Sequence, residues 1–194
     1  MPAALVFLAL AVTGLALASL RYTNPERHLR LYRDPRMIAR VDALAARLVA
    51  AGWSPRASPP DTVPTIRTLA RDDPRGGPLA LRIGCTPRGH WMALEFERDL
   101  GLREGESIGT ALRGDRDGPI PITPDVRQRD GDGFIVRPIE ALPRVSAPLV
   151  RALTEWPRAW HLTIQGRTIT IRADVRDADA IESVVADAIA RLVG

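Results

Sequence analysis

An apolar run near the start of the chain constrains its fold more than any other feature. Residues 3–20 contain no charged side chain over 18 consecutive positions. At about 1.5 Å of rise per residue, a helix of this length reaches roughly 27 Å, close to the hydrocarbon thickness that one helix must cross. The run therefore predicts a single transmembrane anchor, and we expect the rest of the chain to fold outside the bilayer.

The charges around this run predict its orientation. Only Met1 and Pro2 precede it, whereas several arginines follow closely: Arg21, Arg27, Arg30, Arg33, Arg36 and Arg40. Lys and Arg next to a span stay on the cytoplasmic side. We therefore expect a single-pass protein of the plasma membrane, with residues from about 21 to 194 in the cytoplasm. The expected contacts with the membrane surface are Arg21, Arg27, Arg30 and Arg33.

Export is the alternative interpretation of the same run. Ala16, Leu17 and Ala18 form a small-x-small pattern, so a signal peptidase would cleave after Ala18. A secretory signal also has a basic segment before its apolar part, and this chain has none. The single cysteine, Cys85, forms no internal disulfide, which favours a reducing compartment. The anchor is the preferred interpretation, and export stays open.

The distribution of basic residues argues against a nucleic-acid partner. All 27 are arginine, so enzyme classes that need a catalytic or phosphate-binding lysine are excluded. Residues 21–56 hold eight arginines and three acidic residues, whereas residues 57–194 hold 19 arginines and 20 acidic residues. The positive excess therefore lies beside the membrane, and we expect the lipid bilayer, together with a protein partner, to be what the chain binds.

The first helix is expected just after the juxtamembrane segment. Apolar residues at i, i+3, i+4 and i+7 follow Asp34 and Pro35, which suit the N-cap and first helical position, and Gly52 suits the C-terminal stop. The proline-rich residues 53–64 then predict a linker.

Two further helices are expected near the C-terminus. One opens at Ser146 and ends before Pro157. The other carries an Asp-x-x-Glu pair at Asp179 and Glu182, typical of a helix cap, and its apolar stripe continues to Gly194.

Alternating apolar and polar residues predict two β-hairpins. The first joins residues 79–85 to 92–96, and the second joins residues 160–164 to 169–175. A short strand is expected at 134–137, whereas residues 101–133 are rich in Gly, Asp, Pro and Arg and predict mostly loop.

This order of elements predicts an α+β fold. After the N-terminal transmembrane helix, the two hairpins would form an antiparallel sheet with amphipathic helices packed on one face. The predicted parts are an anchor at 1–20, a basic juxtamembrane segment with the first helix and linker at 21–64, and a soluble α+β domain at 65–194.

No recognisable catalytic motif or metal-ligand spacing occurs in the sequence, so no catalytic residue, metal or cofactor is expected. If the chain were an enzyme or a ligand-binding domain, its site would lie near the first hairpin and involve Cys85, His90, Glu95 and Glu97. Burial of Cys85 among apolar neighbours and solvation of the two glutamates explain these residues more simply.

The four tryptophans, Trp53, Trp91, Trp156 and Trp160, have two interpretations. They either line an apolar groove or close the core where helix and hairpin meet, and the second is preferred because large aromatic residues dominate burial in small domains.

The C-terminal third resembles uncharacterised single-span bacterial membrane proteins. The resemblance rests on the segment APLVRAL at 147–153, the hairpin at 162–175 and the closing alanine-rich helix. It implies an anchored α+β protein and carries no functional residue. Taken together, the sequence predicts a non-enzymatic cytoplasmic interaction domain held at the inner membrane.

Overall fold

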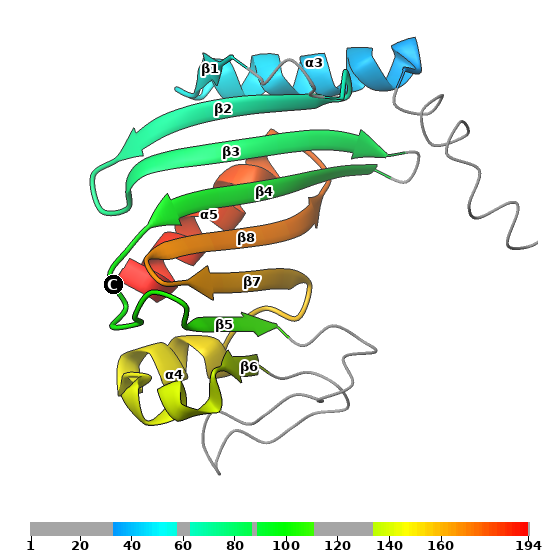
Figure 1. Ribbon diagram of the computed structural model, residues 1–194. Coiled ribbons are helices and arrows are strands. Elements are labelled where there is room, and N and C mark those ends of the chain that lie inside the picture. Colours follow the sequence, from blue (N-terminus) through cyan, green and yellow to red (C-terminus); the bar gives the residue numbers. More distant parts are fainter. Residues whose placement is uncertain (1–32, 58–62, 87–88, 111–133, 194) are drawn as a thin grey trace, which may run out of the picture.

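The computed structural model describes residues 33–57, 63–86, 89–110 and 134–193. Within these ranges eight strands form one antiparallel sheet, in the order β1-β2-β3-β4-β8-β7-β5-β6 (Figure 1). The strands are β1 Ser54–Arg56, β2 Ile66–Asp73, β3 Gly77–Thr86, β4 Gly89–Glu97, β5 Ser107–Thr110, β6 Phe134–Arg137, β7 Trp160–Gln165 and β8 Thr168–Val175.

Three α-helices and one 3₁₀ helix accompany the sheet in the described residues: α3 Pro35–Ala50, α4 Ala147–Thr154, α5 Ala178–Val193 and η1 Ile139–Arg144. The predicted α+β class and the antiparallel sheet containing both hairpins are therefore confirmed. No helix among the described residues is long and apolar enough to cross a bilayer. The predicted span at 3–20 lies outside the described residues.

The helix ends follow from local side-chain chemistry. Asp34 caps α3 by accepting the backbone N–H of Arg36, and Gly52 follows the helix with a φ of 97°. Ser146 likewise caps α4 by accepting the N–H of Leu149. The prediction for α5 was wrong in its cap: Asp177, not Asp179, accepts the N–H of Ala180, because the helix begins one residue before Asp179.

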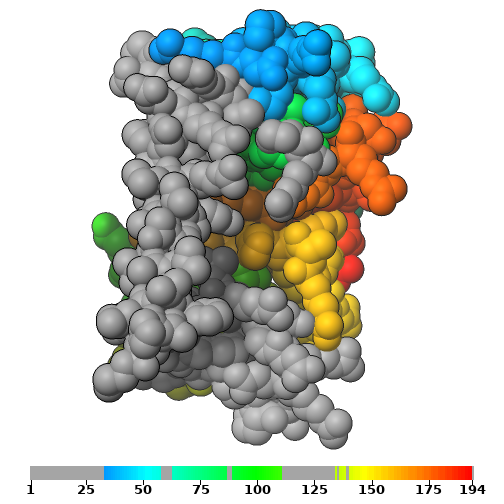
Figure 2. All heavy atoms as spheres, turned by 90° about the vertical axis from the view of Figure 1, so that its right-hand side faces the viewer, coloured from blue at the N-terminus to red at the C-terminus, as the bar shows by residue number. Residues whose placement is uncertain are grey.

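One face of the sheet forms the core because its apolar side chains are aligned across neighbouring strands. Leu81, Leu94, Ile171 and Leu162 are aligned partners across β3, β4, β8 and β7, and all four are fully buried. The buried stripes of α3 and α5 join the same core. Figure 1 shows α5 behind the sheet, and in Figure 2 its red atoms lie along one side while the blue α3 crosses the top.

Three strands were not predicted. β1 lies in the expected linker and β5 lies in the expected loop, of which residues 111–133 are outside the described residues. β2 was missed because Arg67 and Arg71 occupy positions on its core-facing side, next to Leu69, and interrupt the apolar alternation.

A polar cluster at the edge of the core satisfies one of these arginines. Arg71 pairs with Glu182 of α5 at 2.8 Å, and its guanidinium lies 4.4 Å from the ring centroid of Trp53. The indole N–H of Trp53, itself 2% exposed, donates to the same carboxylate at 2.5 Å. Glu182 thus joins α5 to β2 and to the segment that follows α3.

We expect Glu182→Ala to destabilise the fold by about 2 kcal/mol, since it leaves the indole N–H and the Arg71 guanidinium without their acceptor. Chemical denaturation of the full chain in a neutral detergent measures the loss. Asp179→Ala is the matched control on the same helix. Its pair with Arg47 spans 3.6 Å between exposed side chains, so its loss should stay under about 1 kcal/mol. Equal losses would contradict the role given to Glu182.

Glu106 performs a similar task at the other end of the sheet. Its carboxylate accepts the backbone N–H of Arg103 at 3.0 Å and pairs with Arg144 at the end of η1, and its carbonyl accepts the N–H of Gly166. The Arg103 N–H, followed by the Arg144 guanidinium, lowers the pKa of Glu106 below its ordinary value despite partial desolvation.

A lowered pKa stabilises the fold above the unfolded-state pKa of about 4.3, and this contribution is lost as the pH falls through the folded-state value. We therefore expect Glu106→Gln to lower the unfolding midpoint at pH 7 and to differ less from wild type near pH 3. The exposed Glu104, for which the structure describes no partner, supplies the control Glu104→Gln. A difference for Glu106→Gln that is independent of pH would disprove the electrostatic explanation.

Candidate functional site

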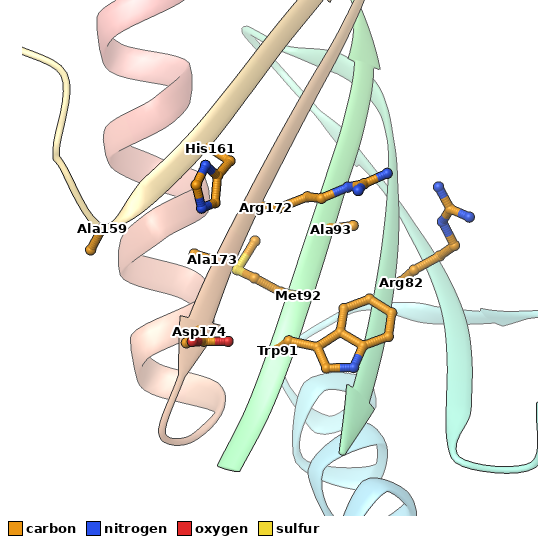
Figure 3. Close-up of a pocket in the computed structure, with 9 residues that line it drawn as sticks. All are labelled: Arg82, Trp91, Met92, Ala93, Ala159, His161, Arg172, Ala173 and Asp174. Carbon is orange, nitrogen blue, oxygen red and sulfur yellow. The ribbon is translucent and has the colours of Figure 1, made fainter. Parts of the chain in front are cut away.

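The second face of the sheet has no helix over it among the described residues. Along β3, β4, β7 and β8 the positions that alternate with the core residues point to this open face. In Figure 3 the side chains of Arg82, Trp91 and Arg172, three of these positions, stand on the side of the strands opposite α5. Most are polar, as expected of an uncovered face.

Strand register places four basic residues in one row across the open face. Arg56 on β1 begins the row and is aligned through Thr68 on β2 with Arg82 on β3. Arg82 is aligned with Ala93 on β4, Ala93 with Arg172 on β8, and Arg172 with His161 on β7. Arg82 and Arg172 are exposed, and neither has an ion-pair partner that the structure describes. His161 approaches the hydroxyl of Thr110 at 3.5 Å. The row therefore presents free positive charge on either side of a small residue.

Trp91 lies in the neighbouring row and depends on a glycine. It is aligned with Gly84 on β3 and with Asp174 on β8. A Cβ added to Gly84 would lie only 2.4 Å from two atoms of the indole, so the ring rests over the Gly84 backbone. One face of this half-buried ring is thus held against β3.

These side chains surround a hollow of about 460 Å³ (Figure 3). Ligand sites commonly enclose roughly 300–1,000 Å³, so the hollow has room for a small molecule. Its lining residues are Arg82, Trp91, Met92, Ala93, Ala159, His161, Arg172, Ala173 and Asp174.

The residues proposed from the sequence near the first hairpin do not gather in one place. Cys85 and His90 are aligned partners on the core side, where Cys85 is 2% exposed and its thiol contacts the carbonyl of Thr86 at 3.5 Å. His90 Nδ1 lies 3.3 Å from the carbonyl oxygen of Arg176. Glu95 and Glu97 are exposed on the opposite face. Cys85 and His90 are therefore cross-strand neighbours on one side of the sheet, and the two carboxylates lie on the other side.

No three His, Cys, Asp or Glu residues among those described come close enough to hold a metal ion. Of the predicted membrane-contact residues, Arg33 is exposed just before α3, and Arg21, Arg27 and Arg30 lie outside the described residues. On the helix itself, Arg36 and Arg40 are exposed, and the structure describes no acidic partner for either.

The tryptophans divide between the two interpretations made from the sequence. Trp53 and Trp156 are buried, and Trp156 packs edge-on against Trp160 with ring centroids 5.9 Å apart and donates its N–H to the Trp160 carbonyl. These three close the core. Trp91 instead lies on the open face beside the hollow, whereas the sequence did not predict that Arg82 and Arg172 would lie near it.

Comparisons with known proteins assign no function to the chain. No protein-family model and no curated protein matches the sequence. A crystal structure of the mycobacterial trehalose monomycolate transport factor A, TtfA, matches with a TM-score of 0.46 and 12% identity, covering 82% of this chain and 97% of that one. A likeness this weak assigns no function. The resemblance of the C-terminal third to single-span membrane proteins stays a prediction.

The contact between Gly84 and Trp91 is testable by a double-mutant cycle. We expect Gly84→Ala to cost about 2 kcal/mol of stability in the wild-type background, because the new methyl group displaces the indole. In a Trp91→Ala background the same change should cost less than about 0.5 kcal/mol. Gly109→Ala on the same face, where a Cβ meets nothing closer than 3.7 Å, is the control and should be nearly neutral. Additive effects would show that the ring does not rest on Gly84.

Proposed function

We propose that this chain is a non-enzymatic binding domain held at the cytoplasmic face of the plasma membrane, with the open face of its sheet as the binding surface. The hollow between Arg82, Trp91 and Arg172 is the observation that carries the proposal. It combines free positive charge, an aromatic ring and enough volume for a ligand in one place.

Membrane attachment rests on the sequence. Residues 3–20 are long and apolar enough to span, and the arginines that follow favour a cytoplasmic domain. The exposed Arg33, Arg36 and Arg40 continue this basic segment onto the first turns of α3. Their positive charge supports an arrangement in which that end of the domain lies against an anionic leaflet.

We assign a binding role because the candidate catalytic groups are separated. Cys85 faces the core, whereas Glu95 and Glu97 face away from it across the sheet. Thiol chemistry needs an accessible thiolate beside its base, and a thiol that is 2% exposed does not offer one.

The membrane topology is the first property to test. A tag after Gly194 should resist protease in intact cells and become accessible after lysis. Accessibility in intact cells would overturn the cytoplasmic placement and favour an exported protein, and mass spectrometry of the mature N-terminus would then show whether cleavage follows Ala18.

Charge reversal tests the role of the arginines beside the anchor. Changing Arg21, Arg27, Arg30 and Arg33 together to Glu should invert the topology or reduce insertion, since orientation is set by basic residues within about 20 positions of a span. The control reverses four exposed arginines far from the anchor, and it should leave orientation unchanged: Arg75, Arg98, Arg151 and Arg167. Normal orientation of the first variant would refute this role.

A further inference from the structure

We propose that the hollow on the open face binds a small soluble organic phosphate, with the phosphate between Arg82 and Arg172 and a flat non-polar part of the ligand on Trp91. This inference rests on the proposed function only in taking the open face as the binding surface.

The spacing of the two arginines suits a single anionic group. Arg82 and Arg172 lie on strands two apart in the sheet, which separates their backbones by roughly 9.6 Å. Only the methyl group of Ala93 stands between them, so both long side chains can reach over it from opposite sides. Figure 3 shows both guanidinium groups on the same side of the sheet beside Ala93.

Charge favours a phosphate over a carboxylate in this position. A phosphate monoester carries a charge of about −1.5 to −2 near neutral pH and offers three acceptor oxygens. Two guanidinium groups, each a rigid fork of donors, match that charge and geometry. A carboxylate carries a single charge and needs only one such fork.

Trp91 supplies the second half of the site. Because its ring rests over Gly84, the indole is held in place before any ligand arrives. The Arg82–Ala93–Arg172 row lies two residues further along β4, roughly 7 Å from the row of Trp91. A ligand that joins a phosphate to a ring or other flat apolar group spans this interval.

Asp174 would set the orientation of a bound ligand. It is aligned with Trp91 and follows Arg172 by two residues on the same face of β8. Its negative charge disfavours a phosphate in the Trp91 row and favours one in the arginine row. The anionic and apolar ends of a ligand are therefore distinguished.

The charge of the whole open face indicates a small soluble ligand instead of a lipid leaflet. On the open-face positions of the described strands, four arginines are balanced by four acidic residues: Arg56, Arg82, Arg137 and Arg172 against Asp72, Glu95, Glu97 and Asp174. The formal charges of these side chains cancel, so a flat anionic surface that covers the whole face gains no net attraction. A ligand small enough to enter the arginine row meets net positive charge.

Calorimetry of the full chain in a neutral detergent, with phenyl phosphate as the probe, tests the site. We expect saturable binding, weakened about tenfold or more by Arg82→Gln and by Arg172→Gln. Arg151→Gln, at an exposed arginine on α4, is the matched control and should bind as wild type does. No saturable binding to the wild-type chain, or equal binding by all three variants, would overturn the proposal.

Two more variants test the geometry without removing positive charge. Ala93→Leu fills the space between the arginines and should abolish binding. Trp91→Ala should weaken binding of phenyl phosphate while leaving that of inorganic phosphate nearly unchanged. Circular dichroism confirms that each variant is folded. Undiminished binding by folded Ala93→Leu would place the ligand elsewhere and refute the site.

Vesicles distinguish the source of the phosphate. Phosphatidylcholine vesicles with and without phosphatidic acid offer the same phosphate monoester on a lipid surface. Binding that depends on Arg82 and Arg172 but occurs only on phosphatidic acid vesicles, and not with phenyl phosphate, would overturn a soluble ligand. Calorimetry in detergent does not depend on topology, so failure here and failure of the membrane placement are separate results.

Discussion

The fold depends on the fact that only one face of its sheet is continuously apolar. Leu81, Leu94, Ile171 and Leu162 align across the four central strands, and helices α3 and α5 bury their own apolar stripes against the core that these residues form. A sheet with one apolar face is stable when that face is covered and the other is solvated. This asymmetry also explains why apolar side chains pack on one face, whereas most side chains on the other face are polar.

The cluster of Trp53, Arg71 and Glu182 shows how charged residues enter the covered side. Arg71 occupies a core-facing position on β2, yet its side chain covers the Trp53 ring and ends at the Glu182 carboxylate. Long basic side chains can bury their stems and keep the charged end paired. Arg67 lies four residues earlier on the same side of β2, and its guanidinium pairs with Asp42 of α3. Both arginines therefore fix the position of helices relative to the edge of the sheet.

Sequence patterns predicted the elements whose signals are local. The caps at Asp34 and Ser146 and the alternation in both hairpins depend on neighbouring residues, and these predictions are confirmed. β2 was not predicted because the partners of Arg67 and Arg71 are distant in sequence. The candidate site was not predicted for a related reason. Arg82 and Arg172 come together only because β4 pairs with β8, and no local pattern predicts that pairing. The alignment of Gly84 with Trp91, in contrast, follows from the hairpin turn, so the sequence could have predicted it.

An uncovered face must be polar whatever the protein does, so its polar residues alone indicate nothing. The arrangement of charge is what sets this face apart. Cross-strand neighbours of opposite charge stabilise a sheet, and a solvated face with equal numbers of both signs is expected to use such pairs. Here Arg82 and Arg172 both face Ala93 instead, and the acidic residues Glu95 and Asp174 stand in the rows on either side without an ion pair that the structure describes. The two arginines therefore do not pair with the acidic residues of the neighbouring rows. This is expected if they bind an anionic ligand instead.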